Sequence, residues 1–338
     1  MLVDEKSGLR IIRLTHHSCI STNLYFEMCS FTADARYVLL MSQRGAGRDA
    51  PWDLFRARTD GMELVQMTEV DAMGGIVFSP ETGAAYYAAD RRLHKIDVPT
   101  FDEEIVAELP GPTVDEGYSL GTVDSQGRMY FTKCRLNNED HILVRVDLNT
   151  GKVAQLERGG DFNHLHVDPA GTTLHFNQRE NEQWRSYLID ADGSNLRKSP
   201  FDRFAHHTWF GTTGKMQGTL LPPGRGLAVQ GENDSRFTML AAGHYFWHSA
   251  PSSDTQWVVS DTNWPDEGVQ LLHVPSGRVT YVCDAKSSCS HPQWTHPHPS
   301  LSPEMRYVSF NSDRTGIGQV YLVELTEEFL AGASAAER

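Results

Sequence analysis

Short apolar runs separated by turn-forming residues recur along the chain, and they predict β-strands. Residues 37–41 (YVLLM) and 143–147 (LVRVD) are two examples. Short segments of this kind, bounded by Gly, Pro, Asn, Asp or Ser, are typical of strands. No long segment with the 3.6-residue period of a helix precedes the C-terminal residues. The hydrophobic pattern therefore predicts an all-β protein.

The strands repeat as a unit of apolar strand, turn, apolar strand, polar turn and a third strand that often ends in Asp. Seven copies are found, and their first turns lie 41 to 50 residues apart. This spacing is typical of the four-stranded blades of a propeller. The first turns centre on Asp34, Glu81, Gln126, Ala170, Thr213, Asp254 and Glu304. The repeats predict a seven-bladed β-propeller that forms a single domain over residues 1–338.

The two ends of the chain lie outside the seven repeats. Residues 7–16 contain a strand-like run without a blade of its own. We expect this run to supply the outer strand of blade seven, which would close the ring and remove an open sheet edge. Residues 326–338 are expected to form a short helix or a frayed tail.

Composition and charge exclude several classes of protein. Hydrophobic residues make up 39% of the chain, but no apolar run approaches the ~20 residues that a membrane helix needs. The formal charge of −14 argues against nucleic-acid binding, which requires a basic surface. It also means that an anionic substrate would need a local positive site, such as a metal ion or an arginine.

The N-terminal residues and the cysteines predict a cytoplasmic location. The first residues, MLVDEK, have neither the basic nor the apolar region of a secretory signal. The five cysteines are scattered and lack CxxC spacing, which favours reduced thiols over a disulfide framework. The sequence does not predict an oligomeric state.

The segment Gln293–Pro299 (QWTHPHP) places two imidazoles and an amide close together. Proline disfavours a helical conformation at the residue before it, so an extended backbone is expected here. Side chains two apart on an extended chain point the same way, so His296 and His298 should share a face. The pair is either half of a metal site or a buried, hydrogen-bonded pair at the start of a strand.

Other histidines occupy the same place in neighbouring repeats. The residue six positions before the turn centre is a histidine in repeats four to seven: His164, His207, His248 and His298. Equivalent positions on propeller blades lie at one height around the axis, so these imidazoles should converge. Four histidines in register are difficult to explain as scattered surface residues. This pattern predicts a metal or catalytic cluster.

With these motifs, the chain resembles the oligogalacturonate lyases over almost its whole length. The most specific match is Gln293–Pro299 followed by residues 300–303 (SLSP) and 308–313 (VSFNSD). Supporting matches lie at residues 74–80, 144–152 and 185–197. The family consists of seven-bladed propellers that split short pectin oligosaccharides by β-elimination.

The resemblance implies a set of site residues. It assigns a manganese ion to Gln293, His296, His298 and His248, and an assisting role to Arg185. Three imidazoles and an amide would by their chemistry also suit zinc, iron or nickel, so manganese follows from the resemblance alone.

The resemblance also implies a histidine base, and here two residues compete. The turn spacing selects His207, which we prefer, whereas the family's His-x-x-Trp pattern selects His206 through Trp209. Adjacent residues on a strand face opposite sides, so only one of the two can enter the site. His164, Tyr25 and Trp209 are further candidates for contacts with the substrate, and Tyr245, Trp247 and Trp264 could also stack on sugar rings.

These residue types suit elimination from a uronate. The reaction removes the proton on C5, α to a carboxylate, and releases the sugar oxygen on C4. A metal ion can offset the developing charge, and a histidine can take the proton near neutral pH. The expected function is a metal-dependent oligogalacturonate lyase acting on a small acidic oligosaccharide. The connections at residues 135–141 and 262–268 look shorter than those of the family, so another uronic-acid-containing oligosaccharide stays open. A non-catalytic binding or scaffold propeller is the second alternative.

Overall fold

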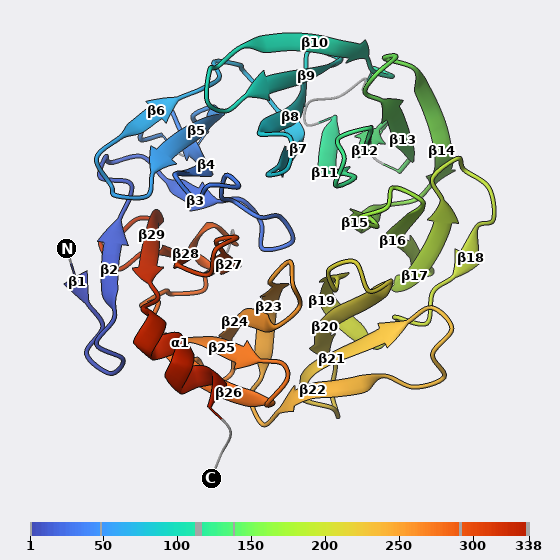
Figure 1. Ribbon diagram of the computed structural model, residues 1–338. Coiled ribbons are helices and arrows are strands. Elements are labelled where there is room, and N and C mark those ends of the chain that lie inside the picture. The colour runs from blue at the N-terminus through green and yellow to red at the C-terminus, as the bar shows by residue number, and fades with distance from the viewer. Residues whose placement is uncertain (1, 48, 112–116, 138, 291–292, 336–338) are drawn as a thin grey trace. The chain divides into compact units, whose positions relative to one another are not determined.

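The computed structural model describes residues 2–47, 49–111, 117–137, 139–290 and 293–335. Within them, the strands form seven antiparallel sheets that follow one another along the chain (Figure 1). The fold is the predicted all-β, seven-bladed β-propeller. By its contacts the chain divides into two compact units, Met1–Glu69 with Phe204–Arg338, and Val70–Arg203.

The first unit contains four of the sheets. Three are four-stranded with their strands in sequence order: β3 (Ser21–Asn23), β4 (Tyr37–Gln43), β5 (Trp52–Arg58) and β6 (Leu64–Gln66); β19 (Phe204–Trp209), β20 (Lys215–Leu220), β21 (Gly226–Gly231) and β22 (Thr238–Ala242); β23 (Phe246–Pro251), β24 (Trp257–Thr262), β25 (Val269–His273) and β26 (Arg278–Cys283). The fourth has the order β1 (Leu2–Val3), β2 (Arg10–Arg13), β29 (Gln319–Glu324), β28 (Tyr307–Ser312) and β27 (Ser300–Leu301).

The second unit contains three four-stranded sheets. Their strands are β7 (Gly74–Ser79), β8 (Ala84–Ala89), β9 (Arg92–Asp97) and β10 (Glu103–Glu108); β11 (Tyr118–Val123), β12 (Met129–Arg135), β13 (His141–Asp147) and β14 (Val153–Gly159); β15 (Phe162–Val167), β16 (Thr173–Glu180), β17 (Gln183–Asp190) and β18 (Arg197–Lys198). In all three sheets, consecutive strands pair antiparallel.

Both ends of the chain join the last sheet of the first unit. β2 pairs antiparallel with β29 in the register Ile11 to Val323, so the N-terminal strand lies where the sequence predicted it. The short β1 extends the same sheet by one more strand, which the sequence did not indicate. Near the C-terminus, the helix α1 (Glu327–Ser334) begins at Thr326, whose Oγ1 accepts a hydrogen bond from the Phe329 amide at 3.1 Å. No helix in the described residues is long and apolar enough to cross a membrane.

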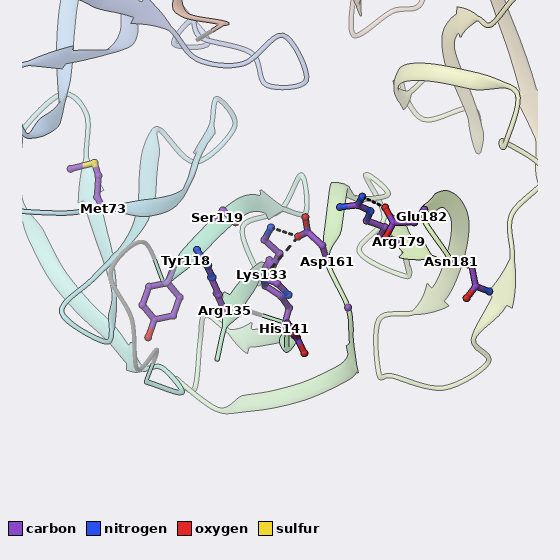
Figure 2. A pocket seen from close by; sticks show the side chains of 12 residues that line it. Met73, Tyr118, Ser119, Lys133, Arg135, His141, Asp161, Arg179, Asn181 and Glu182 are labelled. Atoms are coloured by element: carbon purple, nitrogen blue, oxygen red, sulfur yellow. Dashed lines mark hydrogen bonds and ion pairs between the residues drawn. The ribbon is translucent and has the colours of Figure 1, made fainter. Parts of the chain in front are cut away.

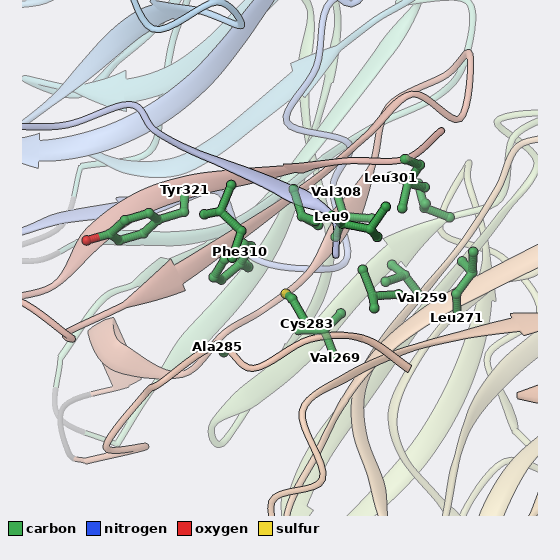
Figure 3. Packing of buried hydrophobic residues seen from close by; sticks show 14 of the residues in the cluster. Leu9, Val259, Val269, Leu271, Cys283, Ala285, Leu301, Val308, Phe310 and Tyr321 are labelled. Atoms are coloured by element: carbon green, nitrogen blue, oxygen red, sulfur yellow. The ribbon is translucent and has the colours of Figure 1, made fainter. Parts of the chain in front are cut away.

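A core of buried side chains joins the β23–β26 sheet to the last sheet. Val259 and Leu271 come from the first of these sheets, whereas Val308, Phe310 and Tyr321 come from the second (Figure 3). All five are buried. Burying one such side chain stabilises a fold by about 1.5–3 kcal/mol, so this core holds the two sheets firmly against each other. The same two sheets position the histidines described next.

Candidate metal centre and its surroundings

Three buried imidazoles converge in the first unit. His248 lies on β23, and His296 and His298 lie in the segment that leads into β27. One candidate ligand atom from each lies within 4.8 Å of the others, and the side chains are at most 6% exposed. The rings of His248 and His298 are 4.2 Å apart, and the other two pairs are 5.5 and 5.7 Å apart. We call these three residues the histidine cluster.

Hydrogen bonds orient two rings of the histidine cluster. The Nδ1 of His248 is 2.9 Å from Oδ2 of Asp261, whose Oδ1 also accepts the backbone amide of His248 at 2.6 Å. The Nε2 of His296 donates to the Cys289 carbonyl at 3.1 Å. When one ring nitrogen donates a hydrogen bond, the other carries the lone pair that a metal needs. With these contacts, Nε2 of His248 and Nδ1 of His296 are the ring nitrogens that could face a metal ion.

His298 contributes a buried ring nitrogen to the histidine cluster. Its Nε2 is buried and has no hydrogen-bond partner among the described residues. Burial, reinforced by the neighbouring imidazoles, lowers the pKa of His298 well below the ordinary value, so the ring is neutral at pH 7. An unsatisfied buried polar atom costs about 1–3 kcal/mol. A neutral imidazole with a spare buried nitrogen is a fitting metal ligand.

The Asp261 carboxyl group is buried beside the histidine cluster. Burial raises the pKa of Asp261 to about 7, against the hydrogen bond from the His248 amide, which lowers it. The carboxyl group therefore holds its position by accepting both hydrogen bonds from His248, not by exposure to solvent. Such a carboxylate behind a histidine is a common way to fix the ring of a metal ligand.

Asparagine side chains hold the backbone of the His-Pro-His segment. Asn311 donates from Nδ2 to the His296 carbonyl at 3.0 Å, and Asn23 donates from Nδ2 to the His298 carbonyl at 2.7 Å. The two asparagines also contact each other, because the backbone amide of Asn23 donates a hydrogen bond to Asn311 Oδ1 at 2.7 Å. Residues from β3 and β28 thus fix the segment at two carbonyls.

The extended backbone predicted for Gln293–Pro299 is wrong in two places. Gln293–Thr295 form a 3₁₀ turn (η1), and His298 adopts a left-handed φ of 44°. Such a conformation costs about 1–3 kcal/mol in a residue other than glycine, which the asparagine contacts help to offset. The two imidazoles meet because the chain turns at His298, and not through simple alternation along a strand.

Gln293 stands at the start of η1 with an exposed side chain. Its carbonyl accepts the His296 amide at 3.0 Å, which places it one turn from the histidine cluster. The role of Gln293 as a metal ligand stays a prediction.

The structure brings His206, and not the preferred His207, to the histidine cluster. The ring of His206 is 4.5 Å from that of His248 and 4.3 Å from that of Trp247. His207 is buried against β20, where a Cβ on Gly218 would lie 2.8 Å from the Cβ of His207. The position expected for His207 is therefore occupied by His206.

The difference of one residue lies in the distance between a β-bulge and the turn that follows it. The register between β19 and β20 shifts between Ala205 and Thr208, and His206 has a left-handed φ of 48°. Leu120 and His164 have left-handed φ values of 59° and 48° at the matching shifts in the second unit. A bulge adds one residue to a strand and redirects a side chain. Leu120 and His164 lie six residues before their turn centres, whereas His206 lies seven residues before Thr213, so a count of six selected its neighbour His207. Which of the two histidines acts as the base stays a prediction.

Aromatic side chains line the histidine cluster. Tyr25 has its ring 4.7 Å from that of His298, and Phe26 has its ring 5.2 Å from that of His248. Burial, with a smaller effect of Glu27, raises the pKa of the Tyr25 hydroxyl, so the phenol stays protonated. Trp209 is half-buried at the end of β19. The contacts of Tyr25 and Trp209 with a substrate stay predictions.

Sequence reasoning missed Asp261 and Phe26. Asp261 follows the apolar run Trp257–Ser260, and an acidic residue near the end of a buried strand was the available signal. Nothing in the local sequence distinguishes Phe26 from an ordinary core residue.

His164 and Arg185 belong to the second unit. The half-buried ring of His164 is 6.3 Å from that of His166. Arg185, on β17, is exposed; it donates to Gln183 and approaches Asp202 at 4.0 Å. Both assignments stay predictions.

The second unit also contains an open pocket of about 850 Å³, which we call the charged pocket (Figure 2). Lys133 donates to Asp161 Oδ1 at 2.9 Å, and Arg179 pairs with Glu182. His141 lies 4.0 Å from Asp161, and burial followed by the charge of Lys133 lowers its pKa. The charges of this pocket are thus largely paired with one another.

Comparisons with individual known proteins cover almost the whole chain. No protein-family model matches it. It is 23% identical over 390 residues to an oligogalacturonate lyase of Dickeya dadantii (strain 3937), covering 96% of this chain and 95% of that protein. The chain resembles oligogalacturonate lyases from end to end. It is also 24% identical to an oligogalacturonide lyase of Pectobacterium atrosepticum, with 96% and 95% covered.

Two solved structures share the fold. An oligogalacturonate lyase in complex with manganese superposes with a TM-score of 0.80 at 21% identity, covering 97% of this chain and 96% of the other. An oligogalacturonate lyase from Vibrio parahaemolyticus superposes with a TM-score of 0.79 at 20% identity, with 97% of each chain covered. The resemblance predicted from the sequence is confirmed, and so is the propeller fold.

Proposed function

We propose that this protein is a metal-dependent oligogalacturonate lyase that cleaves 1,4-linked uronides by β-elimination and leaves 4,5-unsaturated products. The observation that carries the proposal is the histidine cluster: three buried imidazoles whose candidate ligand atoms lie within 4.8 Å. The end-to-end resemblance to oligogalacturonate lyases supports it, and one solved relative is described in complex with manganese.

The donor set fits a divalent metal ion. His248, His296 and His298 would hold it, and Gln293 is proposed as a fourth ligand. Hydrogen bonds to Asp261 and Cys289 preset the rings of His248 and His296. Manganese is the proposed ion, since it is bound in the solved relative. When bound, such an ion supplies Lewis-acid stabilisation of the charge that develops on the uronate.

We assign the removal of the C5 proton to His206. Its ring is 4.5 Å from that of His248, so a uronate held at the histidine cluster would present C5 to a neighbouring imidazole. An imidazole has an ordinary pKa of ~6.5, so its neutral form can accept a proton near neutral pH. The edge of Trp247, 4.3 Å away, limits the rotation of this ring.

Arg185 is proposed to bind a substrate carboxylate. Its guanidinium group is exposed and meets Asp202 only at 4.0 Å. An arginine can hold a carboxylate through two parallel hydrogen bonds. We also propose a cytoplasmic location, because all five cysteines are free thiols.

The test follows the ultraviolet absorbance of the unsaturated product. Purified protein is mixed with digalacturonate and a panel of other uronides, with chelator and then with added manganese. We expect a rise that chelator abolishes and manganese restores, and the panel identifies the sugar. A flat trace on every uronide, from protein shown by elemental analysis to contain the metal, would contradict the proposal.

A further inference from the structure

Two cations of the charged pocket keep N–H groups that the described residues leave without an acceptor. Lys133 donates from Nζ to Asp161 Oδ1 at 2.9 Å and to the Phe162 carbonyl at 3.1 Å, which leaves the third donor of its ammonium group for a ligand. The Arg179 guanidinium group donates only from Nη2, to Glu182, although it has five N–H bonds. The pocket therefore offers positively charged donors in a chain whose formal charge is −14.

Asp161 connects these two cations and supplies an acceptor beside them. Its Oδ1 accepts the hydrogen bond from Lys133, and its backbone carbonyl accepts the Arg179 amide at 2.9 Å. All three residues line the charged pocket (Figure 2). The Asp161 side chain is 43% exposed, and its Oδ2 accepts no hydrogen bond from the described residues. A donor and a carboxylate oxygen side by side can bind a sugar hydroxyl, which both donates and accepts.

The Glu182 carboxylate contacts Arg179 from an exposed turn. Residues 181 and 182 form the two-residue turn between β16 and β17, with left-handed φ values of 46° and 65°. A turn of this kind favours glycine at its second position, where Glu182 stands. The Glu182 side chain is 85% exposed and that of Arg179 is 49% exposed, so their ion pair is weak. A carboxylate from a ligand can therefore replace Glu182 at Arg179.

We propose that the charged pocket binds a uronic acid, whose carboxylate replaces Glu182 as the partner of Arg179. The sugar hydroxyls contact Lys133 and Asp161. An arginine can hold a carboxylate through two parallel hydrogen bonds, whereas Glu182 accepts only one. The pocket volume of about 850 Å³ is in the range of small-molecule sites. The preference for a carboxylate follows from these residues, and the choice of a uronic acid rests on the proposed function.

Calorimetric titration with galacturonate tests the site in full-length protein that carries His298→Ala, a background that removes one imidazole of the histidine cluster. We expect binding that Arg179→Gln weakens at least about tenfold, because the charge-assisted hydrogen bonds to the carboxylate are lost. Arg92→Gln is the matched control, since Arg92 is 47% exposed and its ion pair with Glu108 lies outside the pocket. Equal affinity in these two variants, or no binding of galacturonate in the background, would overturn the proposal.

Removal of the competing carboxylate gives a change of the opposite sign. Glu182→Gln should lower the dissociation constant for galacturonate about two- to fivefold at low salt, because Arg179 then has no anionic partner to exchange. Glu108→Gln, which removes the exposed partner of Arg92, should leave the dissociation constant unchanged. An unchanged or higher dissociation constant in Glu182→Gln would overturn the replacement of Glu182 by the ligand.

Two further ligands define what the pocket recognises. Galactose lacks the carboxylate and acetate lacks the sugar hydroxyls, so each should bind at least about tenfold more weakly than galacturonate. Galactose that binds as tightly as galacturonate would overturn the preference for a carboxylate. Acetate that binds as tightly would overturn the assignment to a sugar acid.

The absorbance assay separates a failure of this inference from a failure of the proposed function. If the wild type cleaves no uronide but galacturonate binding depends on Arg179, the lyase proposal fails and the site in the charged pocket stands. If the wild type cleaves digalacturonate but Arg179→Gln binds galacturonate as Arg92→Gln does, the lyase proposal stands and the site in the charged pocket fails.

Discussion

The histidine cluster of the first unit and the charged pocket of the second each contain a buried imidazole nitrogen without a hydrogen-bond partner in the described residues, at His298 and His141. Their surroundings differ. His298 faces two other imidazoles, and its pKa is lowered by burial and by them. His141 lies beside Lys133, whose positive charge adds to the effect of burial. Neutral nitrogens that converge can share a cation, whereas a nitrogen beside an ammonium group cannot.

The charged pocket and the histidine cluster also differ in how their charged side chains are paired and buried. In the charged pocket, Lys133 pairs with Asp161 and Arg179 with Glu182, with most of these side chains partly exposed. Exposed pairs of this kind contribute about 0–1 kcal/mol each. Beside the histidine cluster, by contrast, the Asp261 carboxyl group is buried and is hydrogen-bonded to the ring of His248. The comparison shows that a chemical site depends on which nitrogens remain unpaired and what they face, more than on the number of polar groups.

His298→Ala should have the largest effect. Removing one of the three imidazoles leaves two histidines, so we expect metal affinity to fall by more than about 100-fold and lyase activity to be lost. Elemental analysis and the absorbance assay measure the two effects. His141→Ala is the matched control, since it removes the corresponding imidazole of the charged pocket and should retain both metal and activity. Full metal content in His298→Ala would contradict the assignment.

His206→Ala should separate chemistry from metal binding. We expect kcat to fall by about 10²–10⁴-fold, because a general base typically contributes that much, while metal content stays at the wild-type level. His207→Ala serves as the neighbour control, with thermal unfolding measured because this side chain is buried. An active His206→Ala together with an inactive, folded His207→Ala would assign the base to His207.

Asp261→Asn should weaken metal binding without abolishing it. The amide oxygen can still accept the His248 backbone amide, but the support of His248 Nδ1 by a carboxylate is lost. Substitutions of such partners typically lower metal affinity about 10- to 100-fold. Titration of metal-free protein with manganese measures the change. An unaltered manganese affinity would show that Asp261 stabilises the fold and does not support the metal ligand His248.

Asp161→Asn should have the smallest effect. It breaks the ion pair with Lys133 in the charged pocket, where the Asp161 side chain is 43% exposed. The expected loss in the free energy of unfolding is about 1 kcal/mol or less, measured by urea denaturation. Metal content and kcat should not change. A loss of metal in this variant would show that metal binding depends on the charged pocket. It would contradict the distinction drawn between this pocket and the histidine cluster.

Most of the fold could be predicted from the sequence, because it follows from local patterns. The spacing of turns gave seven blades, and the apolar runs matched strands such as β13 and β29. The N-terminal strand was placed correctly beside β29. The single-domain organisation of residues 1–338 stays a prediction.

The candidate site was predictable in composition but not in detail. The His-Pro-His segment and His248 were found from spacing, and the structure brings all three imidazoles together. The count of six residues from the turn selected His207, whereas the ring next to His248 belongs to His206, because this repeat has one more residue between its bulge and its turn. Which of the two acts as the base stays a prediction. The His-x-x-Trp pattern of the resembling family, read through Trp209, was the signal that selected His206.

The sequence by itself determined the repeating strands, the turns between them and the supply of histidines, because hydrophobic periodicity and turn chemistry act over a few neighbouring residues. Only the tertiary structure decided which nitrogens converge. The left-handed turn at His298, the support of His248 by Asp261 and the edge-on contact of Trp264 with Trp247 all depend on segments from different strands or loops. Such contacts depend on how strands and sheets pack, and packing is a property of the folded chain as a whole.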